Sequence, residues 1–147
     1  MTLGESFRQL TPERQRDVHL LLCEEALQIW NEYAARKAPI VYYDSVVGVR
    51  HKVDVRLPHD ALHSARLGCD VDDVQHRYLE PTVAMQDDDL VFPRTIKFAY
   101  YAIYNCFRKH ACGEDLDPWL IVNQALAADD SEAAWTKRLT KALSAST

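Results

Sequence analysis

Residues 93 to 110, PRTIKFAYYAIYNCFRKH, decide the fold because they are apolar on nearly every side of a helix. One face carries, at spacings of three and four, Ile96, Ala99, Tyr100, Ile103 and Phe107. The remaining faces are largely filled by Phe98, Tyr101, Ala102 and Tyr104. A helix that is apolar almost all round is typical of the centre of a helical domain. We therefore expect a buried central helix that begins at Pro93 and ends before Gly113.

A long amphipathic helix is predicted over residues 12 to 37. Thr11 suits its N-cap, Pro12 its first position, and Pro39 stops it. Its apolar stripe consists of Val18, Leu21, Leu22, Ala26, Ile29, Trp30 and Tyr33. Leu3 and Phe7 precede it and predict a short lead-in that packs on the same face.

Four more helices follow from cap and stop signals. Pro58 opens one that ends at Gly68, with Leu62, Ala65 and Ala61 inward. Asp70 is expected to cap the next, which would end or restart at Pro81. Its core-facing residues should be Val71, Val74, Tyr78 and Leu79, with Val83, Ala84 and Met85 continuing the pattern. Asp117 and Ser131 should cap two C-terminal helices.

Residues 40 to 58, IVYYDSVVGVRHKVDVRLP, are ambiguous. Their β-branched content and the alternation of Val53, Val55 and Leu57 indicate a hairpin around Gly48. The alternative is a loop with a short helix that buries Val46, Val47, Val49 and Val53. We favour loop and helix, because the rest of the sequence offers no strand for a hairpin to join and an isolated hairpin is only marginally stable.

Composition supports one helical domain. The chain has 147 residues, 48% hydrophobic and 27% charged, enough to bury a core without disulfides. Only four glycines are present, which favours helices over an all-β or glycine-loop fold. We expect an all-α fold, with residues 1 to 147 forming a single compact domain of six or seven helices and a possible short hairpin near residues 40 to 57.

The expected compartment is the cytoplasm. No apolar run reaches the length of a signal peptide or a membrane span. The four cysteines contain no CxxC pair and should be reduced, buried apolar residues: Cys23, Cys69, Cys106 and Cys112.

The negative charge is local. Residues 69 to 90 contain one base, Arg77, and seven acids: Asp70, Asp72, Asp73, Glu80, Asp87, Asp88 and Asp89. The rest of the chain is almost neutral, since the total is −5. This distribution argues against nucleic acid or an anionic membrane as ligand and favours a cationic protein surface, although an acidic rim that only faces solvent is an alternative.

The stretch HDALHSARLGCDVDDVQH, residues 59 to 76, resembles a metal site at first sight. His59 and His63 are four apart, as in zinc-protease helices, and His76 could be a third ligand. However, Asp60 is shorter than the glutamate base of such enzymes, and a helix start disfavours a dication. Three consecutive aspartates, 87 to 89, diverge on any regular element and lack a phosphate-binding loop nearby. We therefore expect no metal and no cofactor.

The sequence contains no recognisable motif for nucleophilic catalysis. There is no G-x-S-x-G motif, and Cys106, His110 and Cys112 are best explained by packing. Asn105, Asn123 and Gln124 lie within apolar helices, where a hydrogen-bond network between helices is expected and an amide-lined ligand pocket near Asn105 and Asn123 is the alternative. The expectation is that the chain is not an enzyme.

Four blocks carry a resemblance to a family: YYDSVVGVRHKVD, RYLEPTVAMQDDDLVFP, FAYYAIYNCFRKH and DPWLIVNQAL. Over residues 20 to 128 the chain resembles small helical immunity proteins of bacterial polymorphic toxin systems. The resemblance implies a cytoplasmic partner that covers a cognate toxin's active site. It supplies no functional residue.

The acids point to the same role as the resemblance. We predict partner contacts at Asp70, Asp72, Asp73, Tyr78, Glu80, Asp87, Asp88 and Asp89, with exposed Tyr42, Tyr43 or Tyr78 as anchors. The alternatives are a helical adaptor or small-ligand-binding regulator, and a metal-dependent hydrolase that uses His59, His63 and His76. The sequence leaves the oligomeric state open.

Overall fold

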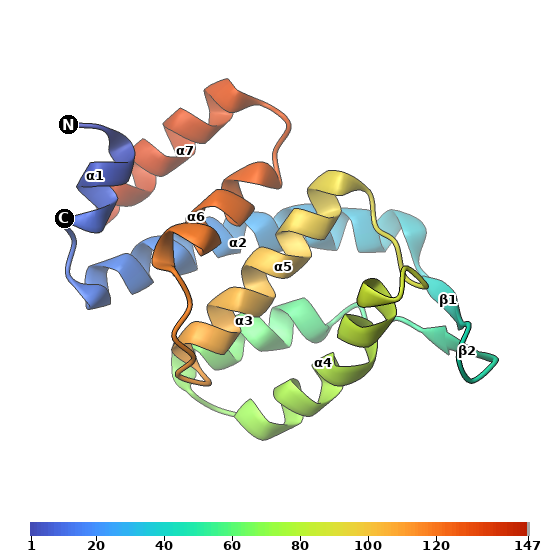
Figure 1. Cartoon of the computed structure of the whole chain (residues 1–147). Helices are drawn as coiled ribbons and strands as arrows, with labels where there is room; N and C mark the ends of the chain where they lie inside the picture. The colour runs from blue at the N-terminus through green and yellow to red at the C-terminus, as the bar shows by residue number, and fades with distance from the viewer. Residues whose placement is uncertain (147) are drawn as a thin grey trace.

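Helix α5 (Arg94–His110) lies at the centre of the fold, as its sequence predicts. The computed structural model describes residues 1 to 146, and Figure 1 shows α5 crossing between its neighbours. It packs on α2 (Pro12–Lys37), α3 (Leu57–Leu67) and α6 (Pro118–Ala127). Eight of its side chains are buried: Ile96, Ala99, Tyr100, Ala102, Ile103, Asn105, Cys106 and Phe107.

Three further helices surround this centre. The predicted lead-in is α1 (Leu3–Arg8), whose Phe7 is fully buried, and α1 lies against α7 (Glu132–Ala145). Helix α4 (Val71–Gln86) lies at the opposite side of the molecule and packs mainly on α3. Residues 1 to 146 thus form seven helices and one two-stranded hairpin. The predicted all-α class and helix number are confirmed.

Most predicted helix ends are confirmed at the atomic level. Thr11 Oγ1 accepts from Arg14 N at 3.3 Å, Asp117 accepts from Trp119 N at 3.0 Å, and Ser131 Oγ accepts from Ala134 N at 3.3 Å. Gly68 closes α3 in the left-handed conformation, at φ +69°. Asp70 occupies the N-cap position of α4, as predicted, but its side chain bonds to no backbone amide and its own backbone is left-handed, at φ +56°.

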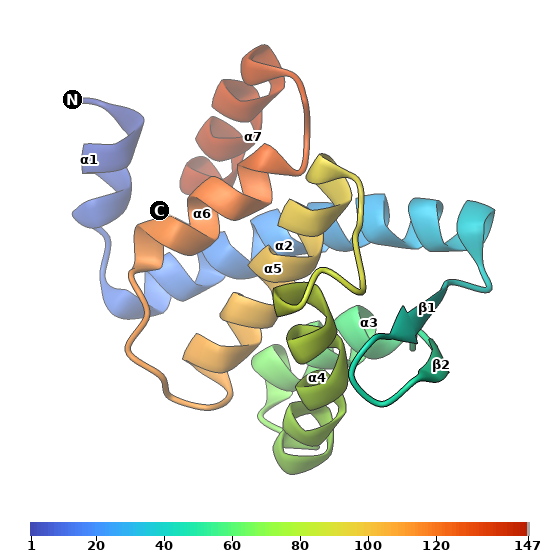
Figure 2. The ribbon, with the colours of Figure 1, turned by 45° about the vertical axis from the view of Figure 1, so that its right-hand side comes forward.

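Residues 40 to 58 contain a β-hairpin, so the favoured prediction of loop and helix is wrong. Strands β1 (Val41–Asp44) and β2 (Val49–Lys52) pair antiparallel, with Tyr42 opposite His51. The hairpin is stable because it is not isolated. Tyr42 is buried against the domain, and its hydroxyl donates to Glu80 of α4 at 2.7 Å. Figure 2 shows the hairpin beside α4.

Helix α4 departs from its prediction in two ways. It continues through Pro81 as one helix instead of ending or restarting there. Leu79 and Val83, expected in the core, are 60% and 54% exposed. The exposure of Leu79 and Val83 follows from the position of α4 at the edge of the domain, where only one side of the helix is covered. The covered side carries Val74 and Tyr78, as predicted, together with Ala84 and Met85.

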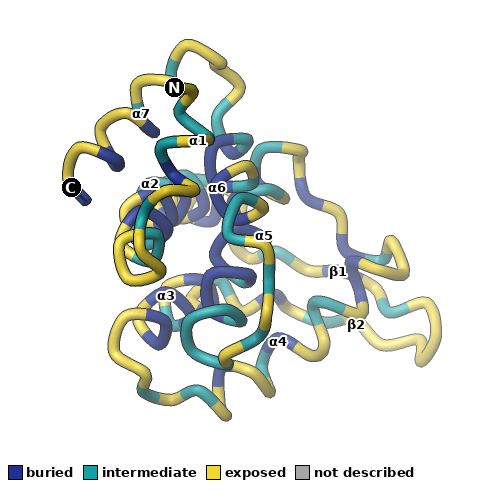
Figure 3. Tube along the Cα trace, turned by 60° about the vertical axis from the view of Figure 1, so that its left-hand side comes forward, coloured by how far each residue is buried: buried dark blue, intermediate teal, exposed yellow. Residues whose placement is uncertain are grey.

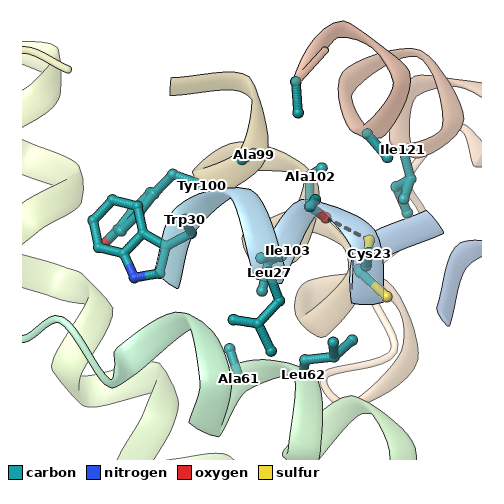
Figure 4. Close-up of a cluster of buried hydrophobic side chains, with 14 of the residues drawn as sticks. Cys23, Leu27, Trp30, Ala61, Leu62, Ala99, Tyr100, Ala102, Ile103 and Ile121 are labelled. Carbon is teal, nitrogen blue, oxygen red and sulfur yellow. Dashed lines mark hydrogen bonds between the residues drawn. The ribbon is translucent and has the colours of Figure 1, made fainter. Parts of the chain in front are cut away.

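The buried side chains form one core cluster whose densest part is aromatic. Trp30 and Tyr100 lie 5.1 Å apart between ring centroids (Figure 4), and Trp30 Nε1 donates to the Val55 carbonyl at 2.9 Å. Cys23 and Cys106 are buried as expected, but Cys69 and Cys112 are partly exposed because they lie in the connections after α3 and α5. Within residues 1 to 146, no helix is both long and apolar enough to cross a bilayer.

Candidate functional site

The seven acids of residues 69 to 90 do not form one continuous patch. Asp70, Asp72 and Asp73 lie at the start of α4, and Asp87, Asp88 and Asp89 follow its end. The 16 residues of α4 separate these two groups by about 24 Å at 1.5 Å per residue. Glu80 lies between them. The predicted contacts are therefore two acidic groups that face different surroundings.

The first group is partly neutralised within the chain. Arg77 Nη1 donates to Asp73 at 3.2 Å, and Arg77 Nη2 donates to Asp60 at 2.9 Å and also to Asp54. Partial burial opposes ionisation of Asp60, but hydrogen bonds from His59 and Arg77 outweigh it and lower the pKa of that carboxyl. Asp70, Asp72 and Asp73 are all exposed, but Asp73 also belongs to an ion-pair network within the chain.

The second group is joined to the hairpin. Asp89 Oδ2 accepts from both the backbone N and the Oγ of Ser45, each at 3.0 Å. Glu80 Oε1 accepts the Tyr42 hydroxyl and lies 3.0 Å from His51 Nδ1. Burial, and then the bond to Glu80, raise the pKa of Tyr42. These contacts hold the hairpin against the C-terminal half of α4.

Exposed apolar side chains concentrate at the same place. Residues 1 to 146 expose twelve large hydrophobic side chains, and eight of them lie between Val41 and Val49 or between Leu79 and Val91. The most exposed of the hairpin are Val46 at 77%, Val47 at 63% and Tyr43 at 58%. Figure 3 shows the hairpin's projecting turn as exposed. This concentration makes the hairpin and the C-terminal half of α4 the candidate interaction surface of the chain.

A shallow hollow of about 340 Å³ connects the hairpin with α4. Its lining combines apolar and acidic side chains: Asp44, Leu79, Glu80, Val83, Ala84, Asp87 and Asp89. We call the whole region the hairpin surface and define it by the hollow's residues together with Tyr43, Val46, Val47, Val49 and Asp88. It brings together four of the predicted contact residues: Glu80, Asp87, Asp88 and Asp89.

Two of the three predicted aromatic anchors are not at the surface. Tyr78 is 1% exposed and Tyr42 is 7% exposed, so the prediction that their side chains project into solvent is wrong. Tyr78 packs on Tyr104 at 4.2 Å between centroids, because it lies on the core-facing side of α4. Tyr42 points inward from β1 toward Glu80. Tyr43, the next residue of the strand, points outward.

The three histidines of the metal hypothesis are not gathered around one point. His59 Nδ1 lies 3.1 Å from its neighbour Asp60, and its ring is parallel to that of His63 at 6.4 Å. His76 lines a different pocket from His59. Within residues 1 to 146, no three His, Cys, Asp or Glu side chains are placed to hold a metal ion.

The predicted amide network is confirmed in part. Asn105 Nδ2 of α5 donates to Gln124 Oε1 of α6 at 2.8 Å, and Arg108 Nη1 donates to Asn105 Oδ1 at 3.2 Å. Asn123 is exposed and takes no part. The alternative of a pocket lined by both Asn105 and Asn123 does not match this arrangement, because one amide is buried and bonded while the other faces solvent.

A hydrogen-bonded pair of a buried and a partly buried histidine is not evident from the sequence. His19 is fully buried; its Nε2 lies 2.8 Å from the Pro118 carbonyl and its Nδ1 lies 2.8 Å from His110 Nε2. A carbonyl only accepts, so His19 Nε2 carries the hydrogen and Nδ1 accepts from His110. Burial lowers the pKa of His19 to about 3 and that of His110 to about 4. The pair joins α2, α5 and the start of α6 as a neutral unit.

Comparison of the chain with protein-family models, curated proteins and solved structures gave no match. The case for a function therefore rests on the geometry of the hairpin surface.

Proposed function

We propose that this chain is an immunity-type protein that acts in the cytoplasm, binding a protein toxin through the hairpin surface and covering its active site. The observation that carries the proposal is the concentration of exposed apolar side chains beside acids. Val46, Val47 and Tyr43 project from the hairpin, and Asp87 and Asp88 lie exposed at the end of α4.

The two kinds of side chain have different tasks in such a complex. Apolar side chains provide the area that is removed from water and dominate affinity when they fill the centre of an interface. Acids around them steer a basic partner during encounter and exclude partners of like charge. The expected partner is therefore a protein whose substrate cleft is rich in Arg or Lys, not a nucleic acid or a membrane.

The predicted contact residues differ in where they lie relative to the hairpin surface, and therefore in the role that we propose for each. Asp87 and Asp88 are exposed and flank the apolar cluster, so we propose them as direct contacts. Asp89 and Glu80 hold the hairpin in place and contribute charge. Asp70, Asp72 and Asp73 lie about 24 Å away at the other end of α4 and would meet only a broad partner. Tyr78 is not proposed as a contact.

The test is coexpression with the products of the open reading frames that flank this gene. A flanking product that stops growth alone and allows growth with the chain supports neutralisation, provided the two copurify as a complex. If no flanking product is both toxic and suppressed, the immunity role is contradicted. Copurification without growth rescue would instead indicate an adaptor, which binds its partner without blocking it.

A further inference from the structure

The open edge of strand β1 carries backbone groups that no other strand among residues 1 to 146 pairs. The sheet has two strands, so each strand has one partner and one open edge. Val53 N donates to the Ile40 carbonyl at 2.8 Å, and the register of the hairpin continues from this pair. Because bonded and non-bonded pairs alternate in an antiparallel ladder, Tyr42 faces β2, whereas Val41 and Tyr43 direct their N–H and C=O groups to the open edge.

The side chains along this edge do not protect it from pairing. Natural edge strands are commonly blunted by charged side chains. Strand β2 is blunted in this way, since Arg50 and Lys52 are exposed beside its open edge. Strand β1 instead exposes Val41 at 51% and Tyr43 at 58%. The hairpin projects from the domain (Figure 1), and the edge of β1 is the one that can accept another strand.

The space beside β1 is open and partly apolar. The strand residue that lines the hollow between the hairpin and α4 is Asp44, which belongs to β1. Leu79 and Val83 line the same hollow from α4 and are largely exposed. A strand added to β1 would lie over this hollow and remove these apolar side chains from water.

A second β1 is a matching strand. Two β1 strands related by a twofold axis at Tyr42 run antiparallel, with Val41 of each copy opposite Tyr43 of the other. Each such pair exchanges two backbone hydrogen bonds, and an aromatic side chain packs across from a β-branched one. The edge extends no further, because Pro39 has no N–H and the Ser45 N–H is already bonded. The outward backbone groups of β1 are thus satisfied by a second copy.

The charges along the hairpin are also self-complementary. Arg36 and Lys37 are exposed at the end of α2, just before β1, and residues 33 to 43 contain no acid. Asp87 and Asp88 are exposed beside the turn, at the opposite end of the hairpin. None of these four side chains forms an ion pair within residues 1 to 146. An antiparallel arrangement brings the basic end of each copy next to the acidic end of the other.

We propose that two copies of this chain associate through the open edge of β1 and form one four-stranded antiparallel sheet across a twofold axis. Only two residues of each copy pair by backbone bonds, so we expect a weak dimer with a Kd of about 10 to 100 µM. The inference goes beyond the function proposed above. The dimer contact overlaps the hairpin surface, so a toxin that docks there would displace the second copy.

The test is sedimentation equilibrium of the isolated chain from about 5 to 500 µM, where a monomer–dimer equilibrium is expected. Tyr43→Pro removes an N–H of the open edge and should weaken association at least tenfold. Arg50→Pro is the matched control, because Arg50 lies opposite Tyr43 and its N–H faces the open edge of β2. A chain that stays monomeric, or forms species larger than a dimer, would overturn the proposal. Equal association of the two proline variants would also overturn it.

Charge reversal tests the twofold arrangement. Lys37→Glu and Asp87→Lys should each weaken self-association about tenfold at low salt, because each places like charges together at both contacts. An equimolar mixture of the two variants should associate as the unmodified chain does, since both contacts of the mixed dimer again join opposite charges. A mixture that associates no better than either variant alone would overturn the proposal. No toxin is used, so a negative result leaves neutralisation untouched, and failed growth rescue leaves dimerisation untouched.

Discussion

Asp89 Oδ2 accepts two hydrogen bonds from Ser45, one from its backbone N and one from its Oγ, both at 3.0 Å. The two residues are 44 positions apart in sequence. Their contact fixes the turn of the hairpin to the acidic connection that follows α4. It holds the hairpin turn, which carries the exposed side chains of Val46 and Val47, next to the carboxylates of residues 87 to 89.

The first prediction concerns this contact. Asp89→Ala should loosen the hairpin and cost about 0.5 to 1.5 kcal/mol of unfolding free energy, since both bonds are lost at a partly exposed site. Hydrogen exchange should accelerate at the paired amides of residues 41 to 52 while the core helices stay protected. Asp87→Ala is the control, because Asp87 is exposed and lies outside this contact. Equal exchange in the two variants would show that the bond to Ser45 does not hold the hairpin.

The second prediction concerns acid stability through His19. Its folded-state pKa of about 3 lies below the ordinary value of 6.5, so the unfolded chain binds the proton first. The stability that His19 contributes is complete above pH 6.5 and is lost as the pH falls from 6.5 toward 3. At pH 5 the loss is about 2 kcal/mol relative to neutral pH.

Urea unfolding of the unmodified chain and of His19→Asn at pH 7 and pH 5 measures this contribution. The variant should be less stable at pH 7, because the bonds to His110 and Pro118 are disturbed. Its further loss between pH 7 and pH 5 should be smaller than that of the unmodified chain by about 2 kcal/mol. A pH dependence that is the same in both chains would contradict a neutral, buried His19.

The third prediction uses the unpaired hydroxyls. Tyr100→Phe and Tyr78→Phe should each raise the unfolding free energy of the isolated chain by about 1 kcal/mol, because each removes a buried polar group without a partner. Tyr42→Phe should have the opposite sign, since the Tyr42 hydroxyl is bonded to Glu80. Thermal or urea unfolding of the three variants shows directly whether each substitution raises or lowers the unfolding free energy. Destabilisation by Tyr100→Phe would mean that its hydroxyl is already satisfied.

The fourth prediction concerns steering by the exposed acids. Asp88 has a left-handed backbone, at φ +58°, which asparagine tolerates better than lysine, so the suitable variant combines Asp87→Lys with Asp88→Asn. Its association rate with the toxin partner proposed above should fall about tenfold or more at low salt, and the difference should shrink as salt is added. Asp130→Lys with Asp115→Asn makes the same charge change elsewhere and should associate normally. Equal rates for both variants would show that Asp87 and Asp88 only face solvent.

The helices were predictable because their signals are local. The apolar stripe of α2, the all-round apolar α5 and the caps at Thr11, Asp117 and Ser131 each act within a few residues. The same reasoning located Asp70 at the start of α4, but it did not predict the left-handed backbone of Asp70 or the absence of a bond from its side chain. The prediction that Leu79 faces the core is also wrong, because the apolar pattern of α4 does not reveal that only one side of this helix is covered.

The site depended on contacts that no local pattern contains. The hairpin is stabilised by Tyr42 and Ser45 bonding to Glu80 and Asp89, which are 38 and 44 positions away. Without those contacts the stretch looks like an isolated and marginal hairpin. The strand alternation was nevertheless visible, and it separates inward Tyr42 from outward Tyr43. It does not show that the hairpin packs beside the acids, because that position depends on the bonds to Glu80 and Asp89.

The most direct test of the central claim is the affinity of the complex when the hairpin's apolar turn is made polar. Val47→Asp should weaken binding to the proposed toxin partner by about 2 kcal/mol or more, roughly thirtyfold in Kd, and should abolish growth rescue. Leu67→Asp is the control, because Leu67 is 67% exposed at the end of α3, outside the hairpin surface. Weakened binding by Val47→Asp alone is the expected result. Unchanged affinity of Val47→Asp would contradict docking through this surface.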